Sequence, residues 1–184
     1  MTTSDARFAA IYESFLRRLY GYSIRRTTPD RVDDVVAETF LIAWRRIDDV
    51  PSGDEALLWL YGVAYKVLGN QWRGHTRRQK LEDRLSAVGI TPVSSVEDYL
   101  IAGEESRQAL QAVSRLKRTD QEILKLAMWE EMAHQDIALV LGIRPGAVKQ
   151  RLYEARKNLT REYNRLETDA SNPPLLRKEV DSDH

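Results

Sequence analysis

The residues between 119 and 162 constrain the fold more than any other part of the chain, because they have the pattern of a helix, a short helix, a tight turn and a longer basic helix. Thr119 and Glu122 have the S/T-x-x-E spacing of a capping box, which predicts the start of the first of these helices. Gly142 suits the left-handed residue that ends a helix, and Pro145 suits the first turn of the next one. The order of these signals predicts a helix-turn-helix unit.

The longer basic helix of this unit has an apolar back and a polar front. Its apolar residues recur at helical spacing: Val148, Leu152, Ala155 and Leu159. The side chains opposite this stripe or on its flanks are Lys149, Gln150, Arg151, Tyr153, Glu154, Arg156 and Lys157. Residues 144–165 contain seven Lys or Arg against two Glu, whereas the whole chain has 28 of each sign. A solvated surface helix is the alternative, but this concentration of charge favours a helix that enters the major groove of DNA.

The length and composition of the chain limit the class of protein. With 184 residues it can form one domain or two small ones. It contains no cysteine, which excludes disulfides and thiolate sites and is compatible with a reducing cytoplasm. Its first residues lack a signal-peptide pattern, and no apolar run approaches the ~18 residues of a membrane span. Because most segments repeat at the helical period, we expect a cytoplasmic all-α protein without membrane insertion.

Two helices are predicted before residue 50. In the first, one stripe contains Phe8, Ile11, Tyr12, Phe15, Leu19 and Tyr22, and the helix should end before Thr27-Thr28-Pro29. The second, from about residue 30 to 47, turns inward Val32, Val36, Phe40, Ala43 and Ile47. Its opposite ridge contains Asp34, Glu38, Leu41 and Arg45, with Trp44 beside it. A purely solvated ridge would rarely contain Leu and Trp, so a partner surface is predicted, the alternative being that Trp44 covers its own core.

A third helix is predicted from about residue 55 into the seventies. Its buried side contains Leu60, Val63, Ala64, Val67 and Gln71. One exposed face is expected to contain Tyr61, Tyr65 and Trp72, and the other Trp59, Lys66, Asn70, Arg73 and Arg77. Cations that pair with phosphates, next to flat rings that stack on bases, are typical of single-stranded nucleic acid binding. The alternative is that the aromatic residues belong to the core and the arginines are simply solvated.

The chain changes character between residues 81 and 96, where Gly, Pro and Ser replace the helical period. This segment is a predicted linker between two helical domains, residues 1–80 and residues 97–166. The second domain should begin with a helix over residues 97–116 that buries Ala109, Leu110, Val113 and Leu116. The polar, Pro-containing residues 167–184 are a predicted disordered tail.

Three sequence blocks together resemble one known family, the bacterial sigma factors of the sigma-70 family, and specifically the two-domain extracytoplasmic-function (ECF) group. DDVVAETFLIAW looks like the helix that binds core RNA polymerase, and WLYGVAYKVLGNQWRGHTRR looks like the helix that reads and melts the −10 promoter element. The helix-turn-helix looks like the unit that reads the −35 element. The blocks follow the family's order and spacing, so the resemblance implies sigma region 2 in residues 1–80 and sigma region 4 in residues 97–166.

The resemblance also implies a role for each matched residue. The positions expected to dock on the clamp helices of the largest polymerase subunit are Asp33, Asp34, Glu38, Phe40, Leu41 and Trp44. Those expected at the −10 element are Lys66, Asn70, Trp72, Arg73, Arg77 and Arg78. Those expected at the −35 element are Lys149, Gln150, Arg151, Tyr153 and Glu154, with Arg156 and Lys157 on phosphates.

The function implied is that of a transcription initiation factor, which directs core polymerase to −35/−10 promoters and assists melting. Its expected partners are core polymerase (clamp helices and flap), promoter DNA and an anti-sigma factor, with no small-molecule substrate, cofactor or metal and no catalysis. Three positions depart from the family pattern. Lys66 replaces a frequent Asn, Glu154 a frequent Arg, and Arg144 a frequent capping Ser, so the promoter sequence that is read should differ.

Two other classes of function are considered. A stand-alone helix-turn-helix repressor or activator would use residues 1–80 for ligand binding or dimerisation, but it would not need the basic and aromatic helix near residues 66–78. A metal protein or enzyme could use Glu130 and His134, spaced i, i+4, with Asp136 nearby. The chain has three histidines and no catalytic signature, so this class is disfavoured.

Overall fold

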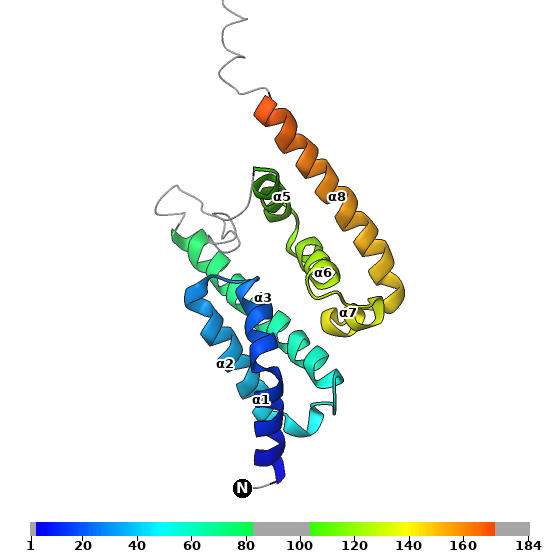
Figure 1. Cartoon of the computed structure of the whole chain (residues 1–184). Helices are drawn as coiled ribbons and strands as arrows, with labels where there is room; N and C mark the ends of the chain where they lie inside the picture. Colours follow the sequence, from blue (N-terminus) through cyan, green and yellow to red (C-terminus); the bar gives the residue numbers. More distant parts are fainter. Residues whose placement is uncertain (1–2, 83–103, 172–184) are drawn as a thin grey trace, which may run out of the picture. The chain divides into compact units, whose positions relative to one another are not determined.

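The computed structural model describes residues 3–82 and 104–171 of the 184-residue chain. Every regular element in those two ranges is a helix, which confirms the all-α class. In chain order the elements are α1 (Thr3–Ile24), α2 (Pro29–Arg45), the 3₁₀ turn η1 (Ile47–Asp49), α3 (Glu55–Glu82), α5 (Glu104–Ser114), α6 (Arg118–Met128), α7 (His134–Leu141) and α8 (Pro145–Ser171) (Figure 1).

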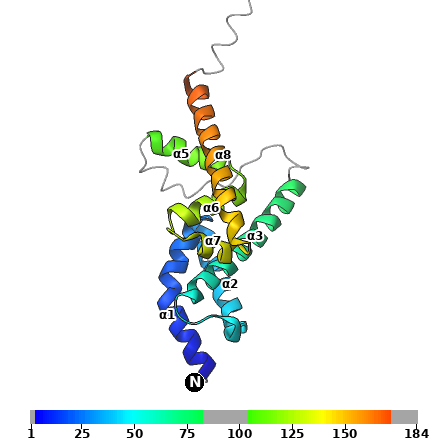
Figure 2. The same ribbon diagram turned by 90° about the vertical axis from the view of Figure 1, so that its right-hand side faces the viewer.

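Helices α1, α2 and α3 form a three-helix bundle in which each helix packs against the other two (Figure 1 and Figure 2). The inward-facing residues predicted for the second helix are all buried, although α2 ends at Arg45 and Ile47 lies in η1. At the centre Leu19, Tyr22 and Leu60 are completely inaccessible. The ring of Tyr22 stacks on Tyr61, with centroids 4.4 Å apart and planes 18° apart. The predicted exposure of Tyr61 is therefore wrong, because α1 covers that side of α3 and leaves the side chain 3% exposed.

A buried threonine and a buried serine lie inside the bundle, and the hydroxyl group of each bonds to its own helix. Thr39 donates a hydrogen bond to the Val35 carbonyl at 2.7 Å, and Ser23 donates one to the Leu19 carbonyl at 2.8 Å. Such bonds to the preceding turn remove the cost of burying an unpaired hydroxyl. Both residues can therefore occupy positions that the helical pattern reserves for apolar side chains.

The turn between α1 and α2 forms where the sequence predicts it. Thr28 has extended backbone angles (φ −73°, ψ 151°), as expected for a residue before proline, and Pro29 is the first residue of α2. The Thr28 hydroxyl hydrogen-bonds the side chain of Asp30, which holds the pKa of that exposed carboxyl below its ordinary value. The loop after α2 is tied to α1, because the Arg7 guanidinium donates to the Val50 carbonyl.

Helices α5, α6 and α8 are linked by polar contacts along α8. The Asn158 amide of α8 donates to the Asp120 carboxylate of α6 at 2.9 Å, and the Gln108 amide of α5 donates to the Tyr163 carbonyl at 3.4 Å. The apolar residues buried in these helices include Ala112, Leu116, Ile123, Leu126, Val148, Leu152, Ala155 and Leu166. The predicted apolar stripe of α8 thus forms the buried side of that helix, with Leu159 at its half-buried edge.

Two predictions of helix register are wrong. Helix α6 begins at Arg118, so Thr119 is already inside the first turn, and the residue before Arg118 caps the helix without a side-chain bond. The predicted capping box of Thr119 and Glu122 is therefore absent, and Glu122 is buried instead. In α5 it is Ala112 that is fully buried, whereas Ala109 is exposed.

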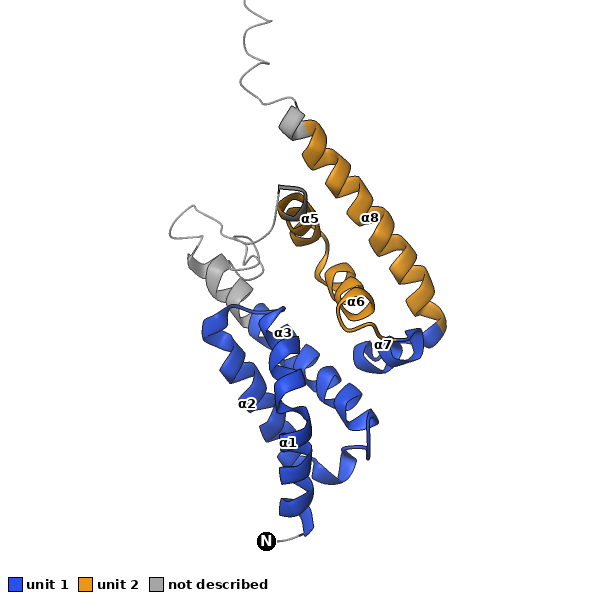
Figure 3. Cartoon of the chain, viewed as in Figure 1, with its two compact units in different colours: residues 1–95, 133–145 blue, residues 96–132, 146–184 orange. Residues whose placement is uncertain are grey.

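Contacts between residues divide the chain into two compact units, residues 1–95 with 133–145 and residues 96–132 with 146–184 (Figure 3). Helix α7 packs on α3 and so belongs to the first unit. Most of the predicted linker (81–96) and most of the predicted tail (167–184) lie outside the described residues. Helix α8 includes residues 167–171, which the sequence pattern assigns to the tail.

Candidate nucleic-acid and partner interfaces

The turn between α7 and α8 has the geometry of a helix-turn-helix connection. Gly142 ends α7 in the left-handed conformation (φ 63°, ψ 39°), where a side chain would be strained, and its amide bonds to carbonyls of the last turn. The Ile143 amide donates to the Ala138 carbonyl at 3.0 Å, which closes the helix end. Pro145 then begins α8. Both sequence signals for this turn are confirmed.

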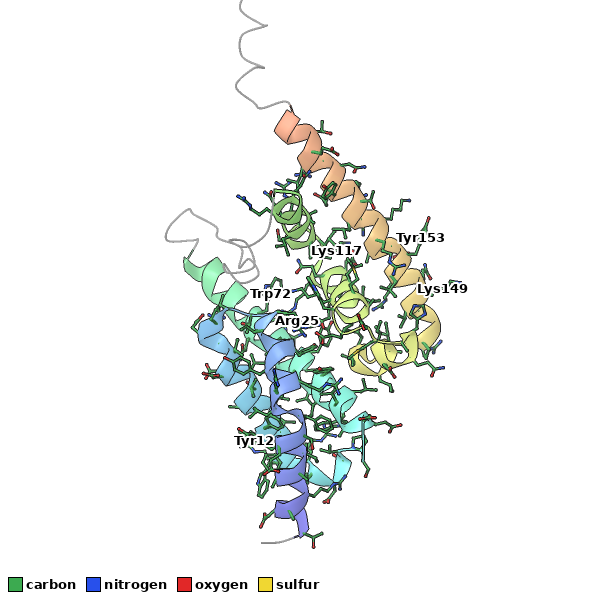
Figure 4. All side chains as sticks on the ribbon, viewed as in Figure 1. Tyr12, Arg25, Trp72, Lys117, Lys149 and Tyr153 are labelled. Carbon is green, nitrogen blue, oxygen red and sulfur yellow. The ribbon has the colours of Figure 1, made fainter. Side chains whose placement is uncertain are left out.

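The outer side of α8 presents seven polar side chains, all exposed, which we call the α8 reading face: Lys149, Gln150, Arg151, Tyr153, Glu154, Arg156 and Lys157. Figure 4 shows Lys149 and Tyr153 directed away from the rest of α8, and Tyr153 is 68% exposed. Gln150 donates to the Glu154 carboxylate at 3.1 Å, so these two side chains are oriented by each other. Arg, Lys and Gln on such a face can hydrogen-bond base edges in a major groove.

One side of α3 presents a second basic surface. Lys66, Asn70 and Arg73 are exposed and lie on one side of the helix, and we call them the α3 stripe. The Arg73 guanidinium donates to the Asn70 side-chain oxygen, which fixes the cation along the helix. Trp72, next to the stripe, is 48% exposed. The side chains of Arg77 and Arg78 lie outside the described residues.

The outer side of α2 combines acidic and apolar residues. We call this surface the α2 ridge; it consists of Asp34, Glu38, Leu41, Trp44 and Arg45, with Asp33 exposed beside it. Leu41 is 45% and Trp44 44% exposed. An apolar pair left open to water among carboxylates is a feature of protein-binding surfaces.

Phe40, which the family resemblance places among the docking residues, is only 3% exposed and lies beneath the ridge. Its ring packs 4.7 Å from Tyr12, centroid to centroid, and the Phe8 ring contacts Trp44 edge-to-face at 5.0 Å. Phe40 therefore packs beneath the ridge, between α2 and α1. Tyr12, 40% exposed, extends the surface onto α1; its place at the edge of an apolar stripe makes it look like a core residue in the sequence.

Other exposed large apolar or aromatic residues carry no prediction from the sequence: Tyr20 on α1, Met128 and Trp129 at the end of α6, and Leu139 on α7. These residues lie off the buried stripes of their helices, so the helical pattern does not mark them. Their apolar character is the one sequence signal that could have identified them. The predicted i, i+4 pair of Glu130 and His134 does not lie on one helix, because a turn separates α6 from α7. Among the described residues no three His, Cys, Asp or Glu side chains are grouped closely enough to hold a metal ion.

Two family models match the chain: Sigma-70 region 2 over residues 11–78, and Sigma-70, region 4 over residues 106–159. The chain belongs to the sigma-70 family. This sigma factor is 27% identical over 159 residues to the ECF RNA polymerase sigma factor SigK of Mycobacterium tuberculosis, with 84% of each chain covered. It is 30% identical over 132 residues to the RNA polymerase sigma factor NccH of Alcaligenes xylosoxydans xylosoxydans, covering 70% of this chain and 71% of NccH.

Other comparisons agree with this assignment. The probable RNA polymerase sigma factor RfaY of Xanthomonas campestris is 30% identical over 133 residues, which is 71% of this sigma factor but 33% of RfaY. The solved sigma factor RpoE of Bartonella quintana, in complex with the anti-sigma factor NepR, has the same fold, with a TM-score of 0.58 and 21% identity over 85% of this chain and 96% of that one. The protein is thus a transcription initiation factor of the ECF group.

The matched regions contain the surfaces described above. The region 2 match includes most of the three-helix bundle, and with it the α2 ridge and the α3 stripe. The region 4 match ends at residue 159 and includes the whole α8 reading face. Among the helices in the described ranges, none has both the length and the hydropathy that crossing a membrane requires.

Proposed function

We propose that this sigma factor binds core RNA polymerase through the α2 ridge, which docks on the clamp helices of the largest subunit. The support is the exposure of Leu41 and Trp44 within the region 2 match, on a helix whose other side is buried. Carboxylates around the apolar pair favour a partner with complementary basic residues. The Phe8 ring packs against both Trp44 and Phe40 and holds Trp44 in place, so little side-chain entropy is lost on docking.

The α3 stripe is the proposed contact with the −10 element. Lys66 and Arg73 supply cations for phosphates, and Trp72 supplies a flat ring on which an unstacked base can lie. Asn70 holds Arg73 and offers an amide for a base edge. Arg77 and Arg78, near the end of the region 2 match, are also assigned to the −10 contact by the family resemblance.

The α8 reading face is the proposed contact with the −35 element. Its cations Lys149 and Arg151 reach base edges in this proposal, while Arg156 and Lys157 reach phosphates. Glu154 accepts from Gln150 within the face, and it repels phosphate or accepts from cytosine. A preference for cytosine at the matching base pair is the corresponding expectation.

The two proposed DNA contacts act together on one promoter. The proposed domains are residues 1–80 and 97–166, joined by residues 81–96, with the second also touching the polymerase flap. Because each contact is small, the polymerase must hold both at the right separation for useful affinity. An anti-sigma factor is a further proposed partner, by analogy with NepR in its complex with RpoE, and the cytoplasm is the proposed location.

The observation that carries this proposal is that one chain contains both family matches and an exposed cationic surface within each. The test is run-off transcription by core polymerase on a library of genomic fragments, with and without the sigma factor. Discrete promoter-directed transcripts that depend on the sigma factor support the proposal. Tight binding of the free chain to a duplex operator, without any association with core polymerase, would support a stand-alone regulator instead.

A further inference from the structure

The second half of α8 contains a hydrogen-bond relay that begins on another helix. The Asn158 amide nitrogen donates to the Asp120 carboxylate of α6 at 2.9 Å, and the Arg161 guanidinium donates to the Asn158 side-chain oxygen at 3.0 Å. A carboxylate only accepts hydrogen bonds and a guanidinium only donates them, so an amide is a group that can join the two. Asp120 lies in the first turn of α6, where the helix dipole favours a negative charge. The relay therefore orients Arg161 relative to α6 as well as to its own helix.

The relay orients the Arg161 cation without neutralising it. Its side chain is exposed, its hydrogen-bond partner is a neutral amide, and no carboxylate in the described part of the chain pairs with it. Arg165, one turn further along α8, is different, because a Glu162 carboxylate oxygen lies 3.8 Å from its guanidinium. Arg161 is thus an oriented and uncompensated cation, which suits it to bind an anion.

Arg161 lies on the same side of α8 as the centre of the α8 reading face. At 100° per residue it is within about 20° of Gln150 and of Glu154 around the helix axis, and within about 40° of Lys157. The region 4 match ends at residue 159, so Arg161 lies outside it. The direction that faces DNA in the proposed −35 contact therefore continues past the end of the family match.

The position of Arg161 along α8 suits a phosphate better than a base edge. It is about 16 Å along the axis from Gln150, at 1.5 Å per residue. The major groove is about 12 Å wide, so phosphates border it within this stretch of a helix that reads bases near Gln150. The guanidinium also bonds to Asn158, three residues earlier, and is therefore turned back towards the groove.

We infer that Arg161 binds a backbone phosphate at the edge of the −35 element, and that Asp120 and Asn158 are positioning residues that hold its guanidinium there. The inference rests on the role proposed above for the α8 reading face, and it extends that surface by one helical turn. Phosphate contacts set affinity and register but carry no direct sequence information, so Arg161 should not change the base preference. Because its side chain is already oriented, little conformational entropy is lost on binding.

The first test counts charges at the interface. The affinity of reconstituted holoenzyme for a promoter fragment from the genomic library is measured by anisotropy between about 50 and 200 mM salt. Arg161→Ala should lower the slope of log K against log salt by about 0.9, whereas the control Arg165→Ala should leave it unchanged, because Glu162 already pairs with that cation. An unchanged slope for a folded Arg161→Ala protein would overturn the inference and leave Arg161 to an acidic protein surface. Equal falls for both arginines would also contradict it, because the effect would then belong to the charge of α8 in general.

The second test locates the phosphate. Phosphates across and beside the −35 element are replaced one at a time by neutral methylphosphonates. One replacement should weaken binding of wild-type holoenzyme about two- to fivefold and have no effect on Arg161→Ala holoenzyme. A scan in which no position shows this difference would refute the contact.

The third test examines the relay. Asn158→Leu retains the Arg161 charge but releases the guanidinium, so the salt slope should stay within about 0.3 of wild type. The methylphosphonate effect at the phosphate assigned to Arg161 should shrink, while effects at the other phosphates stay the same. Asp120→Ala should act in the same way. A merely structural role would lower the melting temperature without this selective loss, and that result would exclude the two residues as positioning residues.

Failure of the proposed function gives a different pattern. If wild-type holoenzyme does not bind the fragment, or if Lys149→Ala with Arg151→Ala binds as tightly as wild type, the −35 assignment fails and this inference fails with it. If that double variant binds poorly while Arg161→Ala matches wild type in the first two tests, the inference alone fails.

Discussion

Replacing Trp44 with asparagine should weaken binding to core polymerase by a factor that follows from its exposure. Trp44 is 44% exposed, and an aromatic side chain can bury up to about 250 Å², so docking can remove about 110 Å² of it from water. At about 25 cal/mol per Å², that is about 2–3 kcal/mol, or roughly a 30- to 100-fold rise in Kd. Biolayer interferometry with immobilised core enzyme measures the change directly.

The control for this prediction is Tyr20→Asn, which removes a residue of similar exposure (41%) on α1, outside the α2 ridge. Its Kd should stay within twofold of wild type. The Trp44 variant also loses the edge-to-face contact with Phe8, worth about 0.5–1.5 kcal/mol of folding stability, so a thermal melt must show that the bundle is still folded at the assay temperature. A folded Trp44→Asn protein that binds core polymerase as tightly as wild type would refute the docking role of the α2 ridge.

Three further outcomes are expected. Lys149→Ala with Arg151→Ala should reduce promoter-directed transcription at least about tenfold while core polymerase binding, measured by interferometry, stays the same; unchanged transcription would count against the α8 reading face. Arg156→Ala should lower the slope of log K against log salt for holoenzyme binding to a promoter by about 0.9, and an unchanged slope would remove it from the phosphate contacts. The Thr28 side chain lowers the pKa of Asp30, so ionised Asp30 stabilises the folded state above the pKa that it has in the unfolded chain, and this stabilisation is lost as the pH falls through the folded-state pKa. Acidification below about pH 4 should therefore lower the free energy of unfolding, measured by urea melts, less for Asp30→Asn than for wild type. Identical pH profiles of the two proteins would contradict this.

Helical periodicity predicts the elements of the N-terminal bundle and the buried side of α8 because those helices bury one continuous stripe. Val148, Leu152 and Ala155 are all buried at the predicted spacing. Backbone signals are equally informative where one residue type dominates the conformation, as at Gly142 and Pro145. These features depend on residues that are close in the sequence, so one sequence is enough to predict them.

One local signal fails, the capping box of Thr119 and Glu122, because α6 begins one residue earlier. Other discrepancies fall where a second helix decides the outcome. Tyr61 is expected on an exposed face, but Tyr22 of α1 stacks on it, and the pattern of α3 alone cannot show which helix covers which side. The helical pattern assigns Phe40 to the core, and the family resemblance assigns it to the docking surface. Its side chain is 3% exposed in the structure and so lies in the core. The packing of α7 on α3 has no counterpart among the predictions, although Gly62 was the available signal: a Cβ atom added there would be 3.4 Å from a backbone oxygen of α7.

The measurement that tests the central claim most directly compares the purified sigma factor, core polymerase and their mixture on one promoter fragment, by footprinting and run-off transcription. The two-contact account predicts protection of both the −35 and −10 elements and a discrete transcript only in the mixture. Full protection by the sigma factor alone at the same concentration, together with no association between the sigma factor and core polymerase, would contradict it.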